Sequence, residues 1–127
     1  RAQFQLGCCY DSGDGAKIDY KAAAQWYRRA AEQGFPHAQF NHGAAFYNGE
    51  GVSQSYDDAV KWFRLAAAQG NADALFSLGV CCQNGIGMPQ DYNEALRLYK
   101  RAAAKGQTRA SGATVKLEAH LAAQRSR

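Results

Sequence analysis

No stretch of this 127-residue sequence approaches the roughly 20 consecutive apolar residues that a membrane-spanning helix needs. No signal peptide opens the chain either. The chain begins at Arg1 without an initiator methionine, so we expect a processed protein or a fragment of a longer one. The length predicts a single domain, residues 1–127, that buries most of its apolar surface.

Several patterns that carry chemistry are also absent. The four cysteines and three histidines form no CxxC or HxxxH pair, so no zinc site is predicted. The only conceivable metal cluster joins Cys81 and Cys82 to His42, and His42 is expected instead at the edge of the core with a local hydrogen bond. No serine, cysteine or acid recurs beside a histidine in a triad-like arrangement. We therefore expect no active site, no metal and no cofactor.

Positive charge is concentrated at the C-terminal end. From Arg97 onward eight lysines and arginines face a single acid, Glu118, whereas residues 1–96 carry seven basic and ten acidic residues. Such an end could meet an acidic partner, RNA or a membrane surface. A solvated helix end is the simpler interpretation, and nucleic-acid binding is not expected.

The main feature present is an internal repeat. The sequence overlays on itself at a shift of 36 residues without gaps, which gives three full units and the start of a fourth. The aligned glycines are Gly7, Gly43 and Gly79; Gly13, Gly49 and Gly85; Gly15, Gly51 and Gly87; and Gly34, Gly70 and Gly106.

The repeat explains the acid-rich stretch DSGDGAKID at residues 11–19. Its copies are YNGEGVSQS and QNGIGMPQD, so the acids are lost while the two glycines persist. A calcium loop could not lose its oxygen ligands in this way. Glycine supplies positive φ and lets backbones approach closely, so GxG is expected to be a turn between two helices.

Each unit is therefore expected to contain two helices. Asp19, Ser55 and Asp91 stand where N-caps are needed, and Asp91 with Glu94 forms a capping-box pattern. The first helices are predicted near residues 2–11, 38–47 and 74–83, and the second helices near residues 20–33, 56–69 and 92–105.

At this point the sequence resembles a known family. Phrases such as AQFQLGCCYDSGDG, AQFNHGAAFYNGEG and DYNEALRLYKRAAAKG resemble Sel-1-like repeats, relatives of the tetratricopeptide repeat. The resemblance implies an all-α fold, a right-handed α/α superhelix (solenoid) with a concave inner surface. The expected units are residues 2–37, 38–73 and 74–109, followed by a capping helix and tail at 110–127.

The sequence departs from the repeat at both ends. Val115 falls where a glycine is expected, although a capping helix with helical spacing at Val115, Leu117, His120 and Leu121 follows Ala110. The N-terminus has no such cap. We expect upstream repeats, a partner chain or a second copy to cover that end.

The resemblance also places a candidate binding groove on the first helices. The groove is expected to bind a peptide or helix of a partner protein. The residues expected at the edge of the groove are Arg1, His37, Asp73 and Arg109. The phenylalanines either line the groove or pack between adjacent first helices, while Tyr47 is the better candidate for a solvent-facing contact. The predicted groove residues are Phe4, Cys8, Asp11, Phe40, Ala44, Tyr47, Phe76, Val80 and Gln83.

The cysteines occur as two vicinal pairs, Cys8-Cys9 and Cys81-Cys82. Vicinal residues on one helix point in different directions, and the first and third units are too far apart for the ~5.5 Å that a disulfide needs. We expect free thiols that act as small core residues, which favours a reducing compartment.

Family members are usually adaptors or scaffolds in protein complexes. The resemblance therefore implies a non-enzymatic protein-interaction module. Two alternatives stay open: a structural subunit held through its uncapped N-terminal face and basic C-terminus, with self-association at the N-terminal end, and a small-ligand or cell-wall-related enzyme. The latter needs a closed polar pocket with a nucleophile, which the sequence does not offer.

Overall fold

The computed structural model describes residues 20–125, and these residues form six helices and no strand. Within this range no helix combines the length and the hydropathy needed to cross a bilayer. The helices are α2 (Tyr20–Glu32), α3 (Pro36–Asn48), α4 (Tyr56–Ala68), α5 (Ala72–Asn84), α6 (Tyr92–Ala104) and α7 (Ala110–Arg125).

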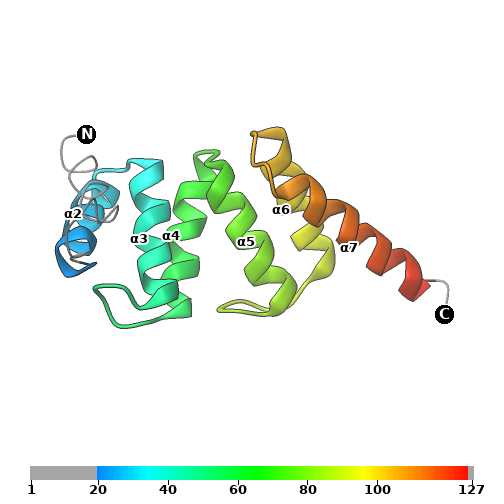
Figure 1. Cartoon of the computed structure of the whole chain (residues 1–127), viewed down its shortest axis with the longest axis horizontal. Helices are drawn as coiled ribbons and strands as arrows, with labels where there is room; N and C mark the ends of the chain where they lie inside the picture. Colours follow the sequence, from blue (N-terminus) through cyan, green and yellow to red (C-terminus); the bar gives the residue numbers. More distant parts are fainter. Residues whose placement is uncertain (1–19, 126–127) are drawn as a thin grey trace, which may run out of the picture.

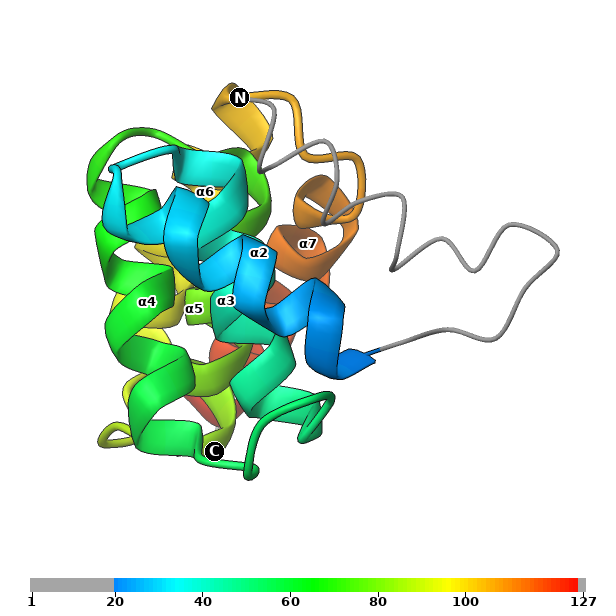
Figure 2. The same cartoon turned by 90° about the vertical axis from the view of Figure 1, so that its left-hand side faces the viewer.

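Each helix packs on the next, so the helices follow one another along the long axis from α2 to α7 (Figure 1). The pairs α3–α4 and α5–α6 are helical hairpins, and α4–α5 and α6–α7 contacts join neighbouring units. Viewed along the stack, α4 lies on one side of α3 and α7 on the other (Figure 2). This arrangement confirms the expected all-α solenoid with a terminal helix.

Two helices begin earlier than the sequence predicted. Both α3 and α5 start two residues before the expected positions 38 and 74. Pro36 opens α3, because a proline at the first helical position loses no intrahelical hydrogen bond. Asn71 caps α5, and its side chain accepts a 2.8 Å hydrogen bond from the backbone N–H of Ala74.

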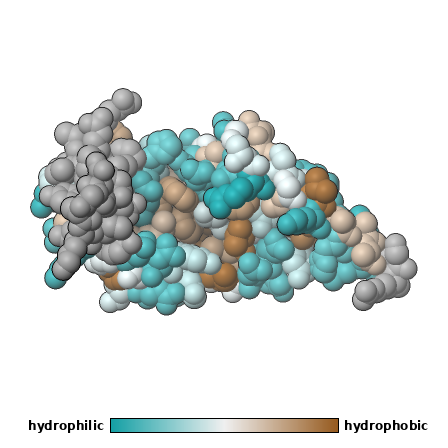
Figure 3. All heavy atoms as spheres, viewed as in Figure 1, coloured by the Kyte–Doolittle hydropathy of each residue, from teal (hydrophilic) through white to brown (hydrophobic). Residues whose placement is uncertain are grey.

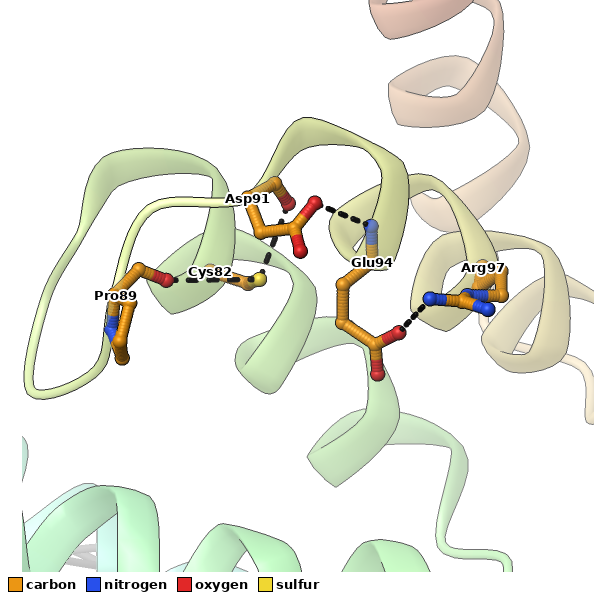
Figure 4. Close-up of polar contacts among 5 residues, drawn as sticks. All are labelled: Cys82, Pro89, Asp91, Glu94 and Arg97. Carbon is orange, nitrogen blue, oxygen red and sulfur yellow. Dashed lines mark hydrogen bonds and ion pairs between the residues drawn. The ribbon is translucent and has the colours of Figure 1, made fainter.

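The expected N-caps of α4 and α6 are confirmed, but the capping box is only half formed. Ser55 and Asp91 accept hydrogen bonds from the backbone three residues on, in the second case from Glu94 (Figure 4). The Glu94 side chain does not return to the Asp91 backbone as a full box requires. It pairs instead with Arg97 at 2.7 Å, while the Asp91 N–H donates to the Cys82 carbonyl.

The glycine pair forms the predicted turn in the second and third units. Gly49 and Gly85 end α3 and α5 in the left-handed conformation, with φ of 69° and 68°. Gly87 has a second role, because a Cβ there would lie 2.7 Å from the backbone oxygen of Tyr56. Gly87 therefore lets the loop of the third unit rest on α4, the second helix of the preceding unit.

Amide side chains fasten each unit to the next. The Nδ2 atom of Asn71 lies 3.4 Å from the ring nitrogen Nδ1 of His37. The Nε2 atom of Gln107 donates a 3.0 Å hydrogen bond to Oδ1 of Asp73. These two pairs are separated by 36 residues, so they are the same contact repeated. Because His37 and Asp73 sit at the start of α3 and α5, the contacts fix where successive first helices begin.

Aromatic rings and glycines interlock inside each hairpin. A Cβ built on Gly43 would lie 2.8 Å from the Phe63 ring, and one on Gly79 would lie 2.6 Å from the Tyr99 ring. Both rings are nearly fully buried. The aromatic ring of the second helix thus packs directly on the repeated glycine of the first helix. A larger residue in place of that glycine would overpack the core.

Helix α7 closes the described stack as expected for a capping helix. Leu117 is buried in the core between α6 and α7, while Val115 is 65% exposed. Lys100 on α6 and Glu118 form a 3.4 Å ion pair across the same interface. Val115 occupies the position of Gly43 and Gly79, and in the described part of the chain no second helix packs against it.

We expect Leu117→Ala to lower the free energy of unfolding by about 2 kcal/mol, at the low end for a buried leucine because α7 has an open outer side onto which it can collapse. Urea unfolding followed by circular dichroism measures the change. Val115→Ala on the same helix is the matched control and should shift stability by under about 0.5 kcal/mol. Equal effects of the two substitutions would contradict the assigned packing of α7.

Candidate binding groove

A hollow of about 310 Å³ lies between α3 and α5, and we call it the central pocket. Its lining is mostly apolar. On the face viewed in Figure 3, hydrophobic residues gather in a depression near the middle of the molecule, with hydrophilic residues around them. The lining residues are Phe40, Ala44, Tyr47, Asn48, Phe63, Phe76, Ser77, Val80, Cys81 and Arg109.

Five of the nine predicted groove residues come together in this pocket: Phe40, Ala44, Tyr47, Phe76 and Val80. They come from one stripe each of α3 and α5, which the 36-residue repeat places side by side. The predicted groove residues Phe4, Cys8 and Asp11 lie outside the residues that the structure describes.

The ninth predicted residue, Gln83, lines a second hollow of about 420 Å³, which we call the flanking pocket. Gln83 accepts a 2.6 Å hydrogen bond from the Tyr99 hydroxyl. Burial raises the pKa of Tyr99 to about 12, so this hydroxyl stays protonated and can donate. The other lining residues are Phe76, Thr108, Arg109, Gly112, Ala113 and Lys116.

The phenylalanines both pack and line the pocket. The Phe40 ring lies 5.6 Å from the Phe63 ring, and the Phe76 ring lies at the same distance from the Tyr99 ring. Each ring is therefore held against the second helix of its own unit rather than only between first helices, and its remaining face stays available. Tyr47 is half-buried and lies 5.2 Å from the Tyr56 ring.

Arg109 joins the two pockets. Its guanidinium lies 4.8 Å from the centre of the Phe76 ring, within cation–π range, and both residues line both pockets. The sequence placed Arg109 at the groove edge but missed Asn48 and Ser77. The available signal was the helical register, since Ser77 lies four residues after Asp73 and one turn before Cys81.

Cys81 forms part of the pocket floor but is not a reactive group. It is buried, and burial raises the pKa of its thiol to about 11, so it is protonated at neutral pH. The Cys82 thiol donates to the Asp91 carbonyl at 3.2 Å (Figure 4). Both are free thiols packed as small core residues, as the sequence predicted, while Cys8 and Cys9 fall outside the described residues.

His42 is more deeply placed than the sequence predicted. Its ring is buried 4.8 Å from both the Phe46 and Trp62 rings, and within the described range its Nδ1 atom has no hydrogen-bond partner. The sequence predicted a histidine at the edge of the core with a local hydrogen bond, and the structure shows no such bond at Nδ1. Burial, followed by the nearby Arg28 charge, lowers the pKa of His42 to about 4, so it is neutral at pH 7.

No metal centre is formed by the part of the chain that the structure describes. Among residues 20–125, no three histidine, cysteine or acidic side chains come close enough to hold a metal ion. The polar groups at the pockets are instead amides, hydroxyls and two cations. This lining suits binding by apolar contact, hydrogen bonds and charge.

The fold and the apolar inner pocket define an α-helical repeat protein. The chain belongs to the Sel1 repeat family, whose pattern matches residues 1–35, 36–71 and 72–107. Sel1 repeat proteins generally mediate protein–protein interactions, and their fold is typically a non-catalytic scaffold.

Two solved structures support the assignment. A Sel1 repeat protein from Oxalobacter formigenes is 44% identical, with a TM-score of 0.82, over 89% of this chain and 46% of its own. The protective antigen c5321 of uropathogenic Escherichia coli, which displays an SLR fold, is 41% identical, with a TM-score of 0.78, over 83% of this chain and 22% of its own. The chain thus spans less than half the length of either protein. No curated protein matches the sequence.

Proposed function

We propose that this chain is a non-enzymatic interaction module that holds a peptide or helix of a partner protein in the central pocket. The observation that carries the proposal is the gathering of partly exposed apolar side chains from two helices around one hollow, namely Phe40, Tyr47, Phe76 and Val80. Apolar side chains arranged in this way are typical anchors for peptide recognition.

The energetics are adequate for such binding. Burying one leucine-sized or phenylalanine-sized partner side chain contributes about 1.5–3 kcal/mol, so two such anchors offset much of the cost of association. The pocket is also preorganised, because Phe40 and Phe76 are each held by a ring of the second helix. A preformed pocket loses less conformational freedom on binding.

The alternative of a catalytic site receives less support. The thiol in the pocket, Cys81, has a pKa of about 11 and is therefore a weak nucleophile at neutral pH. The neighbouring lining groups Asn48 and Ser77 do not titrate near neutral pH. A binding role uses all of these groups as they stand.

The test compares wild type with the double variant Tyr47→Ala plus Ser77→Trp in pull-downs from a native cell extract. The first change removes an anchor, and the second fills the pocket from a partly exposed position. We expect the specific partner to be lost, or its affinity measured by calorimetry to fall at least about tenfold, which corresponds to about 1.4 kcal/mol.

Leu65→Ala is the matched control, because Leu65 is an exposed apolar residue that does not line the central pocket. Thermal melts of all three proteins check that each is folded. A partner that binds the folded pocket variant as tightly as wild type would contradict the proposal and place binding on another face, as the structural-subunit alternative requires.

A further inference from the structure

We propose that the partner segment is acidic as well as apolar: an apolar anchor residue enters the central pocket, and aspartate or glutamate side chains a few residues away enter the flanking pocket. This inference rests on the proposed function and specifies the chemistry of the partner.

The two pockets form one continuous surface. Phe76 and Arg109 line both of them, and the flanking pocket is lined by residues of α5, of α7 and of the turn that precedes α7. A segment seated on Phe76 in the central pocket therefore reaches the flanking pocket without leaving the protein surface. The lining changes from apolar residues such as Phe40 and Val80 in the central pocket to a lining with two cations in the flanking pocket.

The charged side chains that line the two pockets are all positive. Arg109 and Lys116 line the flanking pocket, and neither pocket is lined by an aspartate or glutamate. Among the described residues neither cation lies within 4.0 Å of a carboxylate, since the ion pairs there are Arg28–Glu32, Arg97–Glu94 and Lys100–Glu118. Asp73 near the rim accepts a hydrogen bond from Gln107. An acidic segment would supply the missing complement.

Arg109 is also positioned for a carboxylate. Arg109 is an exposed residue whose guanidinium carbon lies over the Phe76 ring, so the ring restricts its position while solvent still reaches the side chain. A guanidinium binds a carboxylate with two parallel hydrogen bonds, which a lysine does not. Thr108 and Gln83 lie in the same pocket as additional polar groups. Apolar anchors beside two cations suit an acidic peptide better than a nucleic-acid backbone, which needs a longer basic track.

Helix packing fixes the expected spacing. Neighbouring helices lie about 8–10 Å apart, and an extended peptide rises about 3.3 Å per residue. An acid that reaches the flanking pocket should therefore stand about two to four residues from the apolar anchor. This spacing is a property of the partner sequence that selection can measure directly.

The experiment is selection of a random-peptide phage library on three folded proteins. They are wild type, the reversal variant Arg109→Glu plus Lys116→Glu, and the control Lys61→Glu plus Arg101→Glu. The control residues are exposed and line neither pocket, and both variants change the net charge equally. Thermal melts confirm folding, and sedimentation velocity reports the oligomeric state.

The expected result is enrichment, on wild type and control, of peptides with an aliphatic or aromatic residue and an acid two to four positions away. The reversal variant should select lysine or arginine instead. The most enriched wild-type peptide, labelled with fluorescein, should bind the reversal variant at least about tenfold more weakly and bind wild type more weakly as salt rises.

The outcomes separate this inference from the proposed function. If the enriched peptides need Tyr47 but show no acidic bias, the acidic partner is overturned and the central pocket remains a binding site. The same holds if the reversal variant selects the same acidic peptides as wild type. No pocket-dependent peptide at all overturns both proposals. Two other occupants of the pocket would also overturn the acidic partner. One is a second copy of this chain, seen as dimers that Tyr47→Ala plus Ser77→Trp abolishes. The other is RNA, seen as a fluorescent oligouridylate that competes with the peptide.

Discussion

Replacing Tyr99 with alanine is expected to lower the free energy of unfolding by about 3–5 kcal/mol, a large part of the stability of a domain of this size. Tyr99 is 2% exposed and fills the space that Gly79 leaves open on α5. Its ring also holds Phe76, so the central pocket should lose its shape as well. Urea unfolding followed by circular dichroism measures the loss.

Two further variants show whether the ring or the hydroxyl is responsible. Tyr99→Phe removes only the hydrogen bond to Gln83 and should cost about 0.5–1.5 kcal/mol. Gly79→Ala places a methyl group 2.6 Å from the ring, so it should destabilise wild type but be harmless in the Tyr99→Ala protein. Additive effects of the two substitutions would show that glycine and ring do not interlock.

Acidification is expected to destabilise the protein through His42. The pKa of this histidine is about 4 in the folded chain and 6.5 in the unfolded chain, so below pH 6.5 the unfolded state binds the proton first. The contribution of neutral His42 to the free energy of unfolding is therefore fully present above pH 6.5 and is lost as the pH drops toward 4. Since each pKa unit corresponds to 1.36 kcal/mol, the fall attributable to His42 approaches about 3 kcal/mol.

The matched variant is His42→Leu, because leucine occupies the equivalent position 78 in the next unit. At pH 7.5 we expect its stability to differ from wild type by less than about 1.5 kcal/mol, since the volume is similar and an unpaired Nδ1 is removed. Between pH 6.5 and 4.5 it should lose much less stability than wild type. His120→Gln, at an exposed site on α7, is the control, and a wild-type-like acid profile for His42→Leu would contradict the assignment.

The sequence predicted the helices well because the same residues recur every 36 positions. Glycine turns and caps such as Ser55 act locally, so their roles could be read from neighbouring residues. The helix starts at Pro36 and Ala72 were missed although their signals are local, namely a proline at the first helical position and Asn71 as the N-cap. The full capping box did not form because the Glu94 carboxylate pairs with Arg97, a charged partner one turn away.

The apolar floor of the candidate groove and its edge residue Arg109 were predicted, but Asn48, Ser77 and Lys116 were not. Phe40, Phe76 and Val80 follow helical spacing, so their common face could be derived from the repeat. Arg109 and Lys116 meet Gln83 only because α7 packs against the last full unit, where the repeat pattern fades. Likewise, the depth of His42 depends on Trp62 of another helix, which covers its ring.

Val115 occupies the position at which a further repeat would pack its aromatic ring. In the two described hairpins the residue 20 positions after the first-helix glycine is the aromatic ring that rests on it, Phe63 on Gly43 and Tyr99 on Gly79. A unit grafted after α7 in the same register would bring its own ring onto the valine side chain. A unit that followed α7 in the same register would therefore need glycine at position 115 to accept its aromatic ring.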